Sequence, residues 1–156
     1  MKVKGVDPKT GDEIEVEIEN PNDGFFETMR NFDMSDEAIK RMIDKLNVSA
    51  DAKSLLYTLS KATLKVGEYI IKIGRKILDA VCHIFKEFPM ATFGVVFGGI
   101  VGTLITSIPV LGQIIGPIVT PILMALGLVG GLVLDFQDKM LERKIAVKVA
   151  EFSPLA

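Results

Sequence analysis

The residues of this chain that could do nucleophilic or metal chemistry are few and poorly spaced. Cys82 and His83 are the only cysteine and the only histidine, and they are neighbours in the sequence. On a helix, neighbouring side chains point about 100° apart, so these two cannot act together as a nucleophile and its base. One cysteine and one histidine also fall short of the ligand set of a zinc site. We therefore expect Cys82 to be structural.

A row of glutamates near the start of the chain is the other candidate for chemistry. Glu13, Glu15, Glu17 and Glu19 alternate with Ile14, Val16 and Ile18. Such a row could bind a divalent cation, but a strand with one solvated face is the favoured interpretation. The serine-hydrolase, phosphate-loop and dinucleotide-binding motifs do not occur. We expect no enzyme, no metal and no cofactor.

The charges divide the chain into four parts. Residues 1–51 form an acidic head of net charge −6, residues 52–88 are basic at +4, residues 89–134 are uncharged, and residues 135–156 balance. The total of −2 gives no general attraction for nucleic acid, so we expect no nucleic-acid partner. An uncharged run of this length is rare in a soluble domain and favours a membrane protein.

Local signals predict the elements of the acidic head. The alternating run, preceded by turn residues, predicts a β-hairpin over residues 2–19. Ser35, followed by Asp36 and Glu37, predicts the start of a short helix that extends to about residue 47. The head, residues 1–51, is expected to lie in the cytosol and is a possible binding surface for a protein partner.

The basic part is predicted to be one long amphipathic helix, capped by Ser49 and extending to about Phe88. Its apolar residues recur every three or four positions. It could lie on anionic lipid or pack in a bundle, and Gly67 and Gly74 could mark a bend or a close contact. In the lipid interpretation, the headgroup contacts come from Lys65, Lys72, Arg75, Lys76 and Lys86.

The uncharged block is predicted to fold back on itself as a membrane helical hairpin. Residues 89–108 and 118–134 are each near the length that spans a bilayer, and the prolines and glycines of residues 109–117 favour a turn. Basic residues flank both arms, which places both termini in the cytosol and the hairpin in the inner (cytoplasmic) membrane. A charged helix is expected over residues 135–152. The fold class is therefore mainly α, with a small N-terminal β-hairpin, amphipathic helices, an apolar Gly-rich helical hairpin and a charged C-terminal helix.

Glycines within this block recur at the four-residue spacing of a glycine zipper. Such a face lets two helix backbones approach closely, either within the hairpin or between copies of the chain in a homo-oligomer. The expected helix-packing or oligomerisation residues are Gly94, Gly98, Gly102, Gly112, Gly116, Gly127 and Gly131.

Three functions fit this pattern. The first is a self-assembling membrane protein that forms a pore; in composition, residues 89–134 resemble holin-type lysis proteins and phage ejection proteins, without membership in either family. A lumen would then be lined by Thr92, Thr103, Thr106, Ser107 and Thr120. The second is a membrane-anchored structural or adaptor protein within a larger membrane or virion assembly. The third is a helical bundle that hides its apolar hairpin until triggered.

Overall fold

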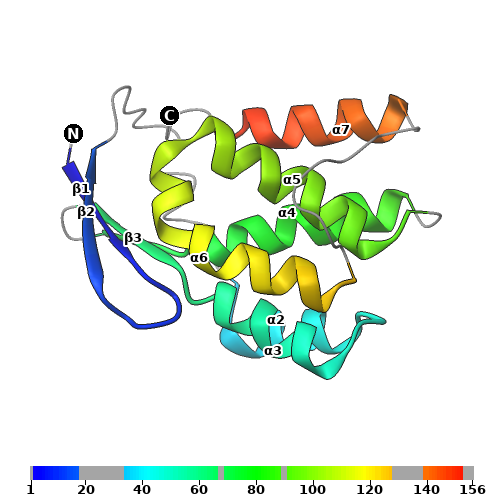
Figure 1. Cartoon of the computed structure of the whole chain (residues 1–156), viewed down its shortest axis with the longest axis horizontal. Coiled ribbons are helices and arrows are strands. Elements are labelled where there is room, and N and C mark those ends of the chain that lie inside the picture. Colours follow the sequence, from blue (N-terminus) through cyan, green and yellow to red (C-terminus); the bar gives the residue numbers. More distant parts are fainter. Residues whose placement is uncertain (1, 18–33, 67–68, 89–90, 128–138, 153–156) are drawn as a thin grey trace.

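A computed structural model describes residues 2–17, 34–66, 69–88, 91–127 and 139–152 (Figure 1). The described part is mainly helical, with a small antiparallel sheet at its N-terminal end, so the expected fold class is confirmed at this level. In chain order the elements are β1 (Lys2–Val6), β2 (Glu13–Glu17), α2 (Asp36–Asp44), α3 (Ala50–Leu59), β3 (Thr63–Val66), β4 (Tyr69–Ile71), α4 (Ile73–Glu87), α5 (Phe93–Ser107), α6 (Pro109–Ala125) and α7 (Lys139–Ala150).

The sheet has the strand order β2-β1-β3-β4, with every neighbouring pair antiparallel. The β-hairpin predicted for residues 2–19 is confirmed for β1 and β2, and residues 18 and 19 lie outside the described residues. Gly5 pairs with Ile14 on one side and with Leu64 on the other, forming an inner row. Lys4 and Lys65 pair on the opposite, solvent-facing side. Two strands alone are marginal in water, and the second hairpin supplies the missing strands.

The single helix predicted from Ser49 to Phe88 is wrong. The chain leaves the helix after α3, forms β3 and β4, and becomes helical again in α4. The residues of the two strands are rich in β-branched and aromatic types, which favour strands over helices. Gly74 in the first turn of α4 marks a close contact: its N–H donates to the Ala62 carbonyl at 3.0 Å, and an added Cβ would collide with the Leu59 carbonyl oxygen.

The predicted N-terminal caps of α2 and α3 are confirmed. The Ser35 hydroxyl accepts a hydrogen bond from the Ala38 N–H, and the Ser49 hydroxyl accepts one from the Ala52 N–H. Each cap satisfies an N–H that has no partner within its own helix. Near the C-terminus, α7 confirms the charged tail helix within its described range.

The described part of the uncharged block folds into two antiparallel helices, α5 and α6, hereafter the uncharged hairpin. The turn predicted over residues 109–117 is wrong, because the chain reverses at Ile108 and α6 begins directly at Pro109. Proline is well tolerated at the first position of a helix, where its missing N–H has no partner to lose. No helix in the described ranges is both long enough and apolar enough to cross a membrane.

The uncharged hairpin lies at the centre of the molecule (Figure 1). α6 packs against β1, β2 and α3, while α5 packs against α4 and α7. These five elements are hereafter the covering elements. All ionisable side chains of the chain precede Phe88 or follow Leu134, so the uncharged hairpin contains none, whereas each of the covering elements carries charged residues.

Candidate functional site

The apolar faces of the uncharged hairpin are buried against the covering elements. Phe97, Ile100 and Leu104 of α5 have no solvent-exposed surface, and neither do Leu111 and Ile115 of α6. Aromatic rings continue this contact into α4: the Phe85 and Phe93 rings meet edge to face at 5.6 Å, and Phe93 stacks on Phe97 at 6.1 Å. Offset and edge-to-face ring pairs add to the stabilisation from area burial.

The weakly polar residues of the uncharged hairpin face solvent in this form. Those expected to line a lumen are all exposed: Thr92, Thr103, Thr106, Ser107 and Thr120. The Thr103 hydroxyl donates to the Gly99 carbonyl at 2.7 Å, and the Thr106 hydroxyl donates to the Gly102 carbonyl at 3.1 Å. Both hydroxyls are thus satisfied within their own helix and need no water.

The glycines expected to pack helices lie in different surroundings. Gly94, Gly98 and Gly102 lie along one face of α5 and are buried. Gly112 supports the close approach of the two helices, because a Cβ there would stand 3.0 Å from the Ile105 carbonyl oxygen. Gly116, in contrast, has open space around it.

Gly127 does not pack a helix. It follows Leu126, the C-cap of α6, with a φ of 85°, a conformation that glycine adopts readily, and its N–H donates to the Met124 carbonyl. It therefore ends the helix. Gly131 lies outside the described residues.

The uncharged hairpin packs closely on the sheet at Gly5 of β1. A Cβ at this position would stand 2.5 Å from Cδ1 and 2.6 Å from Cγ1 of Ile114. The Ile114 side chain therefore fills the space above the glycine, and only a residue without a side chain fits below it. This contact fixes α6 on the inner face of the sheet.

The basic residues expected to contact lipid headgroups do not share one helix. Lys65 lies on the outer face of the sheet, where it forms an ion pair with Glu13. This bond holds the pKa of Glu13 below its usual range, with the charges of Lys65 and Lys4 acting in the same direction. Lys72, Arg75 and Lys76 lie half-buried at the start of α4, and Lys86 is exposed near its end.

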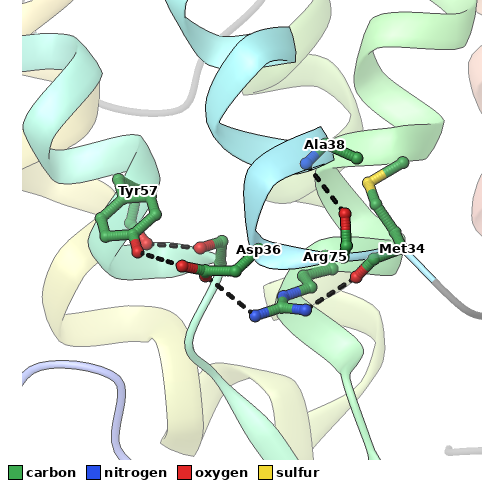
Figure 2. Close-up of polar contacts among 7 residues, drawn as sticks. Met34, Asp36, Ala38, Tyr57 and Arg75 are labelled. Atoms are coloured by element: carbon green, nitrogen blue, oxygen red, sulfur yellow. Dashed lines mark hydrogen bonds and ion pairs between the residues drawn. The ribbon is translucent and has the colours of Figure 1, made fainter.

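Arg75 is at the centre of a cluster that joins α2, α3 and α4 (Figure 2), hereafter the Arg75 clamp. Its guanidinium donates to the Met34 carbonyl at 2.7 Å and forms an ion pair with Asp36 at 3.0 Å. The Tyr57 hydroxyl donates to the other Asp36 carboxylate oxygen at 2.8 Å, which raises the pKa of Tyr57. The Arg75 side chain is 15% exposed. The Arg75 clamp holds α2, α3 and α4 together by charge-assisted hydrogen bonds.

The sequence pattern did not indicate the Arg75 clamp. The cap at Ser35 predicts the place of Asp36 at the start of α2, but Tyr57 and Arg75 follow 21 and 39 residues later. Only the tertiary fold brings these side chains together. No local spacing could have shown it.

Cys82 and His83 do not form a site together. The Cys82 thiol is buried in α4, and burial raises its pKa to about 11, the nearby Asp79 adding to the effect. His83 is exposed and lies 3.5 Å from Glu87. In the part of the chain that the structure describes, no group of three or more histidine, cysteine or acidic side chains could hold a metal ion.

The candidate functional site is therefore the uncharged hairpin, the covering elements packed on it, and the Arg75 clamp, which joins α2 to the covering elements α3 and α4. Comparison with known proteins finds no family model, no curated protein and no solved structure that matches the chain.

Proposed function

We propose that this protein permeabilises membranes, and that the described fold is its stored form. In the active form the uncharged hairpin leaves the covering elements, enters the bilayer and assembles with hairpins of other copies into a pore. One observation carries the proposal: a helical hairpin without ionisable residues lies under five covering elements, each of which carries charged side chains. This combines the first and third functions expected from the sequence.

The exchange of surroundings is physically reasonable for these helices. Their apolar faces are buried against protein here and would be equally well buried in lipid, so insertion exposes little apolar surface of the hairpin to water. Thr103 and Thr106 already donate to carbonyls of their own helix and carry no unsatisfied hydroxyl into the membrane.

The glycines of α5 support the assembly step. Gly94, Gly98 and Gly102 form a face without side chains, on which another helix can approach closely in lipid. In the stored form this face is buried, so self-assembly through it requires the hairpin to leave its place. Insertion and assembly are thereby coupled.

A reversible lock between α6 and the sheet tests the proposal. In a Cys82→Ala background, Gly5→Cys and Ile114→Cys would place their Cβ atoms at most about 4 Å apart, which suits a disulfide. The matched control carries Ile114→Cys and Cys82→Ala alone. The assay is release of carboxyfluorescein from vesicles of phosphatidylglycerol and phosphatidylcholine.

The oxidised double-cysteine protein is expected to leave the vesicles intact and to release dye once dithiothreitol is added. The control should release dye with or without the reductant. Equal release by the oxidised and reduced forms would show that the hairpin does not need to leave the sheet. Intact vesicles at high loads of the wild-type protein would refute permeabilisation altogether.

A further inference from the structure

A groove of about 460 Å³ lies between α2 and α4, on a side of the molecule that the uncharged hairpin does not form. Its floor is apolar, lined by Met42 of α2, by Leu46 just beyond the end of α2, and by Cys82 and Phe85 of α4. A volume of this size falls in the range of small-molecule sites. The Arg75 clamp joins the same two helices at their first turns, and the groove opens beyond it.

Each wall of the groove is formed by side chains that share one face of a helix. Ala38 and Arg41 of α2 and its C-cap Lys45 lie three and four residues apart, and Asp79, Cys82 and Lys86 of α4 have the same spacing. Residues at these spacings share one helix face. Two such stripes face each other, and each ends in a lysine.

The rim of the groove is positively charged. Among the described residues, Arg41, Lys45 and Lys86 line it together with one acid, Asp79. Within the described ranges no carboxylate forms an ion pair with any of the three cations, although many other basic residues have one. Among the described residues, Arg41 donates to the Glu37 carbonyl of its own helix. Three cations above an apolar floor are complementary to a molecule with an apolar chain and an anionic end.

We propose that this groove binds a single long-chain carboxylate, a fatty acid, with its chain on the floor and its carboxylate at the rim. The thiol of Cys82 is protonated at neutral pH, because burial raises its pKa, so it adds uncharged surface to the floor. Arg41 can hold the carboxylate by two parallel N–H donors, and the two lysines add charge without fixed geometry. The site is independent of the proposed permeabilising function.

Binding of dansylaminoundecanoic acid, measured by its fluorescence below the concentration at which it forms micelles, tests the proposal on the full-length protein. We expect saturable binding of one probe per chain, displacement by oleate, and much weaker binding of the probe's methyl ester. Replacing the rim cations by Arg41→Gln with Lys45→Gln should weaken binding roughly fivefold or more. The control pair Lys9→Gln with Lys139→Gln removes equal charge from exposed positions outside the groove and should leave binding unchanged.

A second variant, here called the floor variant, tests whether the space above the apolar floor must be open. Ala38 is half-buried on the α2 wall, so Ala38→Trp should fill the groove and weaken binding at least tenfold, with the helical circular dichroism retained. Unchanged binding in both the rim and the floor variants would overturn the proposal. So would equal affinity for the acid and its ester, or a fluorescence change that occurs only when vesicles are present.

Discussion

Replacing Arg75 by methionine is the most direct perturbation of the Arg75 clamp. Methionine keeps most of the length and the apolar stem of the arginine and removes only the guanidinium. The change breaks the hydrogen bond to the Met34 carbonyl and the ion pair with Asp36. It leaves the uncharged hairpin and its contacts untouched.

The expected cost follows from the exposure of the two partners. The bond from a largely buried guanidinium to a carbonyl is a hydrogen bond to a charged group, worth about 1.5 kcal/mol or more. The Asp36 side chain is 58% exposed, so solvent screens its ion pair to about 0.5 kcal/mol. The free energy of unfolding should therefore fall by about 2 kcal/mol, which is roughly thirtyfold in the equilibrium constant.

Urea denaturation followed by circular dichroism measures this loss, with Lys40→Met as the control that removes an exposed charge from α2. A double-mutant cycle with Asp36→Asn separates the ion pair from the carbonyl bond, and we expect a coupling of about 0.5 kcal/mol. Equal stabilities of Arg75→Met and Lys40→Met would refute the role of the clamp. If the stored-form proposal is also right, Arg75→Met releases vesicle dye faster than the wild type.

Further predictions concern a glycine contact, the thiol and the outer face of the sheet. Gly74→Ala should lower the free energy of unfolding by about 2 kcal/mol or more, because its methyl group meets the Leu59 carbonyl. Gly116→Ala, in open space, should be neutral or slightly stabilising. Similar changes in the free energy of unfolding for the two variants would contradict the close packing at Gly74. The Cys82 pKa of about 11, against an ordinary value of 9.0, should slow modification by a disulfide reagent at about pH 8 roughly a hundredfold relative to the urea-unfolded chain; rates within tenfold would contradict it. Because the Glu13 pKa is lowered from 4.5, the contribution of its ion pair to stability is present above that pH and is lost as the pH falls through the lowered pKa. Glu13→Gln should therefore destabilise the protein at about pH 7, and this loss of stability should shrink as the pH is lowered below 4.5. A loss of stability that does not change with pH would exclude the ion pair as its cause.

Local chemistry explains which elements could be predicted from the sequence. The alternation of Ile14 with glutamates, the caps at Ser35 and Ser49, and the absence of charge in the central block each act within a few residues. The structure has the β-hairpin, the two capped helix starts and the first apolar helix where these signals place them, within a few residues, whereas the second apolar helix begins nine residues earlier than predicted. Of the candidate site, the sequence predicted the uncharged helical hairpin and not the Arg75 clamp.

The elements that were mispredicted depend on distant partners. In β3, Leu64 is buried and Thr63 and Lys65 lie on the other side, a pattern too short to outweigh a helical spacing that continues on both sides. The strand forms because β1 offers it an edge, and the bond between Lys65 and Glu13 spans 52 residues. Contacts at such separations leave no periodic trace in the sequence.

The prolines of α6 misled the prediction for another reason. Pro117 and Pro121 lie inside the helix, where each frees the carbonyl four residues before it, at Gln113 and at Pro117. Gln113 and Pro117 are exposed, so the freed carbonyls lie on the one side of α6 that water reaches. A helix can therefore pass through both prolines in this position.

The exposed side of α6, which carries Gln113 and Pro117, constrains how this helix could lie in a membrane. A backbone carbonyl without a partner costs several kcal/mol in hydrocarbon, so the side of α6 that carries Gln113 and Pro117 must remain wet or meet another polar group after insertion. In the proposed pore this side faces the lumen, and the buried side with Ile115 faces lipid or another helix. In a Cys82→Ala background, Gln113→Cys in vesicles should react with a charged, water-soluble thiol reagent, whereas Ile115→Cys should not. Protection of Gln113→Cys together with labelling of Ile115→Cys would reverse the orientation and refute the argument from the proline carbonyls.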